Sequence, residues 1–247
     1  MSTRFGVTAS QIARTAIDGF AAELLSHGAG AAMIFDACIA DPECALAQAY
    51  AGALFLTRMT RDGKVQASPR VASAQLLAQA QGERHAAAFA AAMAHWLAGR
   101  DRDAVTVLTA LLDRWPDDLV ALKFCQILQL GIGDIQGMLR TAATTVAACS
   151  DGGFADGMLA FALDQAGETD RAEIYARRAV DRHPQTDPWA QHALAHVHAA
   201  REEWSHGRAF LRGAAASWLR CSSFIRTHNW WHAALFSIEL GQRDEAL

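Results

Sequence analysis

The stretches GRDRDAVTVLTALLDRWP (residues 99–116) and GETDRAEIYARRAVDRHP (residues 167–184) decide the fold, because each begins with Gly and ends with Pro. With Gly133 between them, Gly99, Gly133 and Gly167 lie 34 residues apart. This is the period of tetratricopeptide repeats, each of which is a pair of antiparallel helices. The Gly ends the first helix of a repeat, and the Pro ends the second because it has no N–H to donate. We therefore expect an all-α, right-handed α-solenoid of about seven tetratricopeptide helix pairs.

The composition of the 247-residue chain fits closely packed helices and excludes several classes of protein. Hydrophobic residues make up 52% of it, and many of them are Ala, whereas β-branched residues are sparse. The net charge of −4, without a Lys/Arg cluster, argues against a nucleic-acid partner. Five cysteines without a CxxC pair indicate reduced, mostly buried thiols. The N-terminus lacks the apolar core of a signal peptide, and the apolar stretch 85–97 is too short to span a bilayer, so we expect a cytoplasmic protein with no membrane partner.

The chain is predicted to have two parts that differ in regularity. Residues 1–82 are expected to form degenerate N-terminal helical repeats, with helices at 12–26, 29–40, 45–59 and 71–81 and a long polar loop at 60–70. Residues 83–247 are expected to form a regular array with helices at 85–98, 102–114, 118–131, 134–148, 154–166, 169–182, 188–200, 203–217 and 225–240. The last repeat is predicted to be incomplete, because the segment from Gly241 to Leu247 resembles the one that starts at Gly167. We expect truncation, or completion by a partner chain.

A small residue in the second helix of each repeat aligns the repeats with one another, and this alignment predicts which way each side chain points. The small residues are Ala104, Ala172, Gly207 and Ala246. In tetratricopeptide arrays the first helix of each repeat lines the concave surface.

This frame places two histidine pairs on the concave face of consecutive repeats. His192 and His196 belong to one repeat, and His228 and His232 belong to the next. Each pair is spaced i, i+4, so both rings lie on one helix face about 6 Å apart. Adjacent helices pack about 8–10 Å apart, which would allow the two pairs to converge.

The remaining side chains predicted on this face are mostly apolar. One of them is an acid, Asp164, which lies one repeat before the first histidine pair. A hydrophobic groove with a few convergent polar groups is typical of a ligand site. The predicted ligand-binding residues are His192, His196, His228, His232, Asn229, Trp231, Trp189, Asp164 and Phe161. Further side chains expected to face the groove are Met158, Phe124, Ile127, Lys123, Phe89, Met93 and Trp96. Trp230 is instead expected to pack in the core, at a position where repeats of this type often carry Trp.

The histidine cluster has three interpretations from sequence alone. Neutral imidazole and carboxylate are ligands of zinc, iron and manganese, so His192, His196, His228 and His232 could hold a divalent metal ion. Alternatively, the rings hydrogen-bond one another and the backbone in a purely structural role. In the third interpretation, one histidine is a base or a hydrogen-bonding group in a metal-free site. Asn229 is expected to orient a histidine.

The strings GMLAFALDQAGETDRAE (157–173), HALAHVH (192–198) and THNWWHAALFSIELGQRDEAL (227–247) resemble the tetratricopeptide repeat protein 38 family. The resemblance implies an α-solenoid with His192, His196, His228, Asn229, Trp230 and His232 at motif positions, but it implies no reaction. Members of this family often have Glu where this chain has Asp164, and they extend beyond its last residue.

We therefore expect a repeat protein that binds a peptide, a partner or a small molecule in a histidine-lined concave groove. The alternative is an enzyme, a hydrolase or lyase, in which the cluster is a metal site or supplies a general base. A homo-oligomer formed through exposed end repeats would leave the cluster structural.

Overall fold

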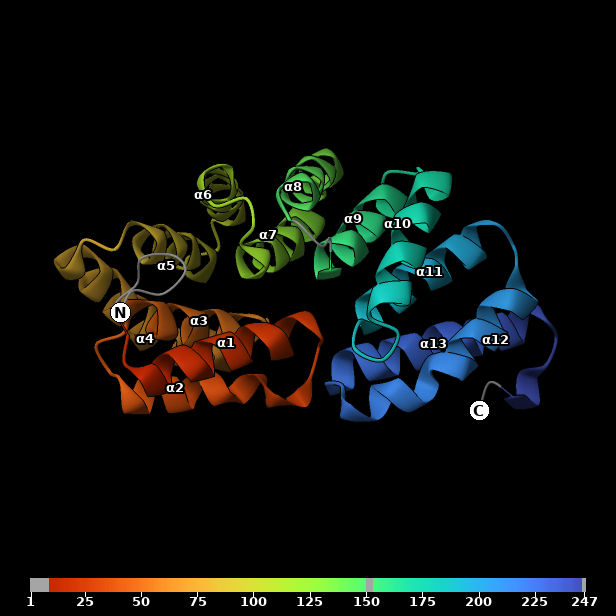
Figure 1. Cartoon of the computed structure of the whole chain (residues 1–247), viewed down its shortest axis with the longest axis horizontal. Coiled ribbons are helices and arrows are strands. Elements are labelled where there is room, and N and C mark those ends of the chain that lie inside the picture. Colours follow the sequence, from red (N-terminus) through yellow and green to blue (C-terminus); the bar gives the residue numbers. More distant parts are fainter. Residues whose placement is uncertain (1–8, 150–152, 246–247) are drawn as a thin grey trace. The chain divides into compact units, whose positions relative to one another are not determined.

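The computed structural model describes residues 9–149 and 153–245, and these residues form thirteen α-helices joined by short connections (Figure 1). Within these ranges the structure has no β-strand, and its only β-type pairing is an isolated bridge between Gly28 and Cys221. The prediction of an all-α, solenoid-like fold is confirmed. The chain forms two compact units, each described below by itself.

The first unit consists of the chain up to Leu24 together with residues Gly30–Asp134. Its elements are α1 (Gln11–Leu25), a 3₁₀ helix (Ala29–Met33), α2 (Ile34–Ala40), α3 (Ala45–Leu56), α4 (Arg61–Gln81), α5 (Arg84–Leu97), α6 (Asp101–Arg114) and α7 (Leu119–Ile132). A buried row of rings joins alternate helices in its core: Phe20 lies 5.2 Å from Tyr50, Tyr50 lies 5.0 Å from Phe89, and Phe89 lies 5.7 Å from Phe124. Phe89, Met93 and Phe124 are fully buried, so the prediction that they face an open groove is wrong.

The predicted loop at 60–70 is also wrong, because α4 runs without interruption through these residues. Thr60 caps the helix, its Oγ1 accepting a hydrogen bond from the N–H of Gly63 at 3.0 Å. The buried residues of α4 are mostly small and recur every three or four positions, where the helix packs against α3. This packing stabilises a helix that contains Pro69 and whose exposed residues are mostly polar.

The glycine and proline positions of the repeat frame behave as predicted. Gly99, Gly133 and Gly167 have φ angles of +72°, +74° and +78° just after α5, α7 and α9. This left-handed conformation costs glycine little and ends each helix. The helices α6 and α10 end two residues before Pro116 and Pro184, as the frame requires.

The second unit combines residues Leu25–Ala29 with residues Ile135–Leu247. Its elements are α8 (Ile135–Ala148), α9 (Gly153–Gln165), α10 (Thr169–Arg182), α11 (Pro188–Ala200), α12 (Trp204–Ala214), a 3₁₀ helix (Ala215–Arg220), α13 (Ser223–Glu239) and a 3₁₀ turn (Arg243–Glu245). Its C-terminal core surrounds the fully buried Trp218, whose Nε1–H donates to Gln191 Oε1 at 2.6 Å. Ala246, the last small residue of the predicted frame, and Leu247 lie outside the described residues.

The two units divide the chain near residue 134, whereas the predicted change in repeat regularity lies at residue 82. Contacts and repeat regularity are different properties, so the division into residues 1–82 and 83–247 stays a prediction.

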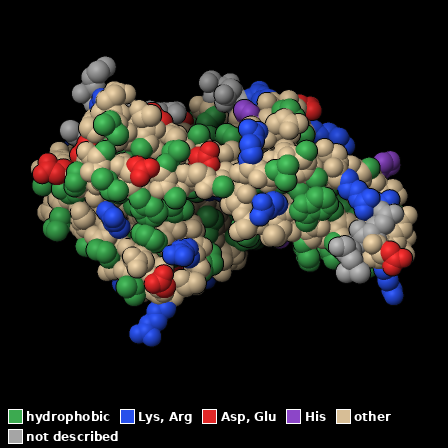
Figure 2. All heavy atoms as spheres, turned by 90° about the horizontal axis from the view of Figure 1, so that it is seen from below, with side chains coloured by type: hydrophobic (Ala, Val, Ile, Leu, Met, Phe, Trp, Pro, Cys, Tyr) green, Lys and Arg blue, Asp and Glu red, His purple; other side chains and the backbone are tan. Residues whose placement is uncertain are grey.

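The predictions about nucleic-acid and membrane partners depend on how charge is distributed over the surface and on how long and apolar the helices are. On the face drawn in Figure 2, Lys and Arg side chains are scattered among hydrophobic and other groups. Among the described residues, no helix combines the length and the apolar character needed to cross a bilayer.

Candidate metal site

Helices α11 and α13 carry the histidine pairs and pack against each other. Asp187 begins α11 by accepting a hydrogen bond from the N–H of Ala190 at 2.8 Å, and Pro188 occupies the first turn. The side chain of Asn229 in α13 donates to the backbone oxygen of Pro188 at 3.1 Å. Asn229 is fully buried, so this bond fixes α13 to the start of α11. In the structure Asn229 therefore positions the helix that carries two of the histidines.

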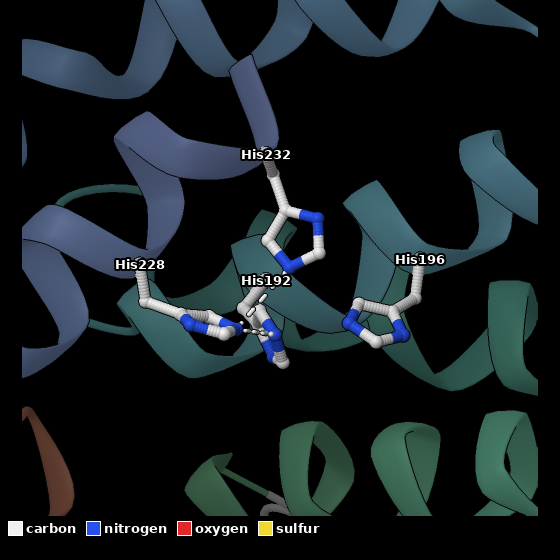
Figure 3. Close-up of side chains that lie close together, drawn as sticks. All are labelled: His192, His196, His228 and His232. Carbon is white, nitrogen blue, oxygen red and sulfur yellow. Dashed lines mark hydrogen bonds between the residues drawn. The ribbon is translucent and has the colours of Figure 1, made fainter. Parts of the chain in front are cut away.

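The structure brings the four predicted histidines together (Figure 3). His192 and His196 project from α11, and His228 and His232 project from α13. One ligand nitrogen from each ring lies within 4.8 Å of the ligand nitrogens of the other three. Among the described residues this is the group whose donor atoms are arranged to hold a metal ion.

In this cluster one ring nitrogen, Nε2 of His228, lies close to the ring nitrogens of two other histidines. His228 Nε2 lies 2.9 Å from His192 Nε2 and 3.2 Å from His232 Nε2. An imidazole nitrogen has one in-plane position, which holds either a proton or a lone pair. His228 Nε2 can therefore form only one good hydrogen bond with its two neighbours. A cation at the centre would accept a lone pair from all three, and the edges of a tetrahedral zinc–nitrogen site are roughly 3.3 Å long.

The fourth histidine is held by a carboxylate. His196 Nδ1 lies 3.0 Å from Asp164 Oδ2, an acid at the end of α9. When Nδ1–H donates to this oxygen, the lone pair of the ring is on Nε2. Figure 3 shows that the other nitrogen of His196 faces the remaining rings. A carboxylate that orients a histidine in this way is common in metal sites.

The surroundings keep three of the imidazoles neutral. Burial lowers the pKa of His232 to about 3, with a further contribution from His196 and His228. Burial also lowers the pKa of His192 well below its usual value and lowers the pKa of His228. Metal ions bind the neutral form of histidine, so these rings are in the form that a metal requires near neutral pH.

Aromatic side chains enclose the buried side of the cluster. Trp189 stacks on His192 with ring centroids 4.8 Å apart and also packs on Phe161 at 4.7 Å. Phe161 in turn contacts His192 and His196 at 5.5 and 5.9 Å. These rings restrict water around His192, which strengthens electrostatic interactions in the cluster.

On its other side the cluster reaches the surface beside exposed rings. Trp231 is 53% exposed and contacts His228 and His232 with centroids 5.6 and 4.9 Å apart. Its neighbour Trp230 is 47% exposed and touches Trp218 edge-on, so the prediction that Trp230 belongs to the core is wrong. An exposed apolar side chain beside convergent polar groups is a common feature of ligand sites.

Sequence reasoning missed two rings next to the cluster, those of His27 and Phe224. The ring of Phe224 stacks on His228, and the ring of His27 stacks on Trp189. Phe224 lies in the first turn of α13, one residue before the predicted start of this helix at residue 225. His27 lies between helices, where the repeat frame makes no statement about side-chain direction.

The donor set favours one class of metal ion. The four converging ligand atoms are all imidazole nitrogens, and the nearby carboxylate of Asp164 contacts a ring rather than the centre. Imidazole suits zinc, copper, nickel, cobalt and iron, whereas magnesium and calcium prefer oxygen. The residues therefore fit a borderline transition-metal ion.

Comparisons with known proteins support the fold. No protein family model matches the chain. The chain is similar to the crystal structure of a tetratricopeptide repeat protein from Parabacteroides merdae ATCC 43184, with a TM-score of 0.56 and 14% sequence identity. The match covers 78% of this chain and 73% of that protein. Identity this low bears on the fold alone, and the chain has a tetratricopeptide-like fold.

Proposed function

We propose that this chain is a tetratricopeptide-type binding protein whose second unit holds a transition-metal ion between α11 and α13. The observation that carries the proposal is the convergence of His192, His196, His228 and His232, whose ligand nitrogens lie within 4.8 Å of one another. Four imidazole rings this close together cannot all be satisfied by hydrogen bonds to one another. A bound cation would satisfy every lone pair and would explain the carboxylate behind His196.

The second part of the proposal is that a ligand binds beside the metal, on the partly open side of the cluster. Trp231 offers an exposed ring there, while Trp189 and Phe161 form the apolar wall behind His192. A small molecule or peptide with a metal-binding polar group and an apolar part would match both features. Repeat folds of this kind commonly serve as binding scaffolds. A groove that extends beyond these residues stays a prediction, as does a homo-oligomer.

An enzyme remains the alternative function of the same residues. A bound transition metal can lower the pKa of water and polarise a carbonyl group. Here His228 Nε2 lies 2.9 Å from His192 Nε2 and 3.2 Å from His232 Nε2, while Nδ1 of His196 contacts Asp164. Three protein ligands with an open fourth position are typical of catalytic zinc, whereas four are typical of structural zinc. A hydrolase or lyase would require the first arrangement.

Two further proposals concern relatives and location. We propose membership of the tetratricopeptide repeat protein 38 family, supported by the HALAHVH and HNWWH strings that contain the four histidines of the cluster.

We also propose a cytoplasmic location. Burial raises the pKa of Cys38 to about 11 and that of Cys125 to about 12, so these thiols would stay protonated and unreactive.

Metal analysis of untagged protein tests the metal proposal. The wild-type chain is expected to contain about one equivalent of zinc, iron, copper, nickel or cobalt after purification. The variant His228→Gln/His232→Gln should lose it. The control His183→Gln/His206→Gln changes two histidines of the same unit outside the cluster and should retain it. Equal metal content in the two variants, or no uptake by the wild type in a zinc titration, would refute the proposal.

A further inference from the structure

Five rings form a closed circuit around one side of the histidine cluster. Starting from His192, the circuit passes to Trp189 at 4.8 Å and then to His27 at 5.4 Å. It continues to Phe224 at 6.3 Å and to His228 at 5.9 Å. The contact of 2.9 Å between His228 Nε2 and His192 Nε2 closes it. The four stacking contacts have interplanar angles between 18° and 30°, so neighbouring rings are close to parallel.

His27 is the one member of this circuit that belongs to neither α11 nor α13. It comes from Leu25–Ala29, which belongs by its contacts to the second unit. Its backbone oxygen accepts a hydrogen bond from the N–H of Ser222 at 2.7 Å, one residue before α13 begins. The next residue, Gly28, forms the isolated β-bridge with Cys221. The segment is therefore attached by its backbone to the turn that leads into α13.

The backbone of His27 is in an unfavourable conformation. Its φ angle is +52°, a value that is uncommon for residues other than glycine. Such a conformation persists when the surrounding structure fixes it, and it is frequent at functional sites. The contacts that fix it here are the hydrogen bond to Ser222, the adjacent bridge, and the two rings that flank the imidazole.

We infer that His27 is a positioning residue of the histidine site, which holds the rings of His192 and His228 in the orientation that binds the metal. This inference rests on the proposed metal-binding function. The ring of His27 lies between Trp189 and Phe224. Trp189 packs against His192 of α11, and Phe224 packs against His228 of α13. Without the His27 ring, Trp189 and Phe224 lose the group that keeps them apart. His192 and His228 then gain freedom to rotate away from each other.

The role of His27 is to pack against other rings, and it is not a ligand of the metal. The four histidines with converging ligand atoms do not include it. Supporting residues of metal sites typically contribute about 10–100-fold to metal affinity, because they fix the ligands before the metal arrives. Phe224 is 60% exposed, so burial alone does not hold its ring in place.

Two variants of His27 separate ring packing from the chemistry of imidazole. His27→Ala removes the ring, whereas His27→Phe keeps a flat ring and removes both nitrogens. His183→Ala is the matched control, because His183 stacks on Phe154 at 5.0 Å in the same unit and is not part of the circuit. Cobalt(II) titration gives the affinity and the visible spectrum of the site. Long-range ¹H–¹⁵N spectra of the metal-free proteins report the ring environments of His192 and His228, and far-UV circular dichroism verifies folding.

We expect His27→Ala to weaken cobalt binding by about 10–100-fold and to shift or broaden the ring signals of His192 and His228. His27→Phe should restore both, and His183→Ala should match the wild type. Unchanged affinity and unchanged ring signals in His27→Ala would overturn the inference. It is overturned too if His27→Phe is as defective as His27→Ala, because imidazole itself would then be required. If the wild type binds no cobalt, the proposed function fails, and the ring spectra still decide whether His27 positions the two histidines.

Discussion

Acidification should destabilise the second unit of the metal-free protein, because three cluster histidines have lowered pKa values in the fold. In an unfolded chain the pKa of histidine is about 6.5. In the structure, burial and then the neighbouring His196 lower the pKa of His232 to about 3. The unfolded state therefore binds more protons than the folded state below about pH 6.5. Stability is fully present above this pH and falls as the pH decreases toward about 3.

The size of the effect follows from these two pKa values. At about pH 5, the protonation of His232 in the unfolded chain lowers the free energy of unfolding by at most about 2 kcal/mol. Solvent that reaches the cluster reduces this figure. His192 acts in the same direction, because burial lowers its pKa as well. With an ordinary dependence of stability on urea, a loss of about 2 kcal/mol moves the midpoint of unfolding down by about 1 M.

Hydrogen exchange at increasing urea measures this change on peptides from α11 and α13. Urea midpoints, rather than exchange rates, are compared at about pH 7.5 and about pH 5 with a chelator present, because the intrinsic exchange rate itself depends on pH. The variant His232→Gln should show a smaller difference between the two midpoints than the wild type. Equal wild-type midpoints at both pH values, or an equal difference in the variant, would refute the reasoning.

Three other substitutions test separate parts of the structure. Gly207→Ala would place a Cβ 2.6 Å from a ring carbon of Phe236, so we expect the free energy of unfolding, measured by heat or urea, to fall by about 1–3 kcal/mol. An unchanged unfolding midpoint would contradict the close packing of α12. Thr60→Ala removes the cap of α4 and should lower the stability of this helix by about 1 kcal/mol, which would appear as faster amide exchange in its first turn. Unchanged exchange would show that the cap contributes little. Asp164→Asn should weaken cobalt binding by about 10–100-fold, measured by titration, with little change in folding. Cobalt affinity equal to that of the wild type would show that the carboxylate does not orient His196.

The repeat frame was predictable because it depends on residues with strong backbone preferences. Gly99, Gly133 and Gly167 adopt the left-handed conformation after their helices, and α10 and α11 have the bounds that the spacing predicted. The segment 60–70 was not predictable in this way. Its polar residues and Pro69 are typical of a loop, and the packing that stabilises the helix α4 involves small residues with a weak hydrophobic signal.

The candidate site shows the same division between local and long-range information. The i, i+4 spacing of each histidine pair predicted which rings share a helix face, and the 34-residue period predicted which helices are neighbours. The contact of His27 with Trp189 depends on a non-helical turn far away in the sequence, so no period could indicate it. The exposure of Trp230 depends on which side chains pack around it, and its edge-on contact with Trp218 leaves it 47% exposed, which the sequence pattern does not specify.

X-ray absorption spectroscopy of the zinc-loaded chain tests the central claim most directly, because it reads the atoms around the metal. We predict three or four imidazole nitrogens at about 2.0–2.1 Å from zinc, with no sulfur at about 2.3 Å. The same protein with His228→Gln/His232→Gln should not give this spectrum. A first shell of oxygen alone, or an identical spectrum from the variant, would contradict a metal site between α11 and α13.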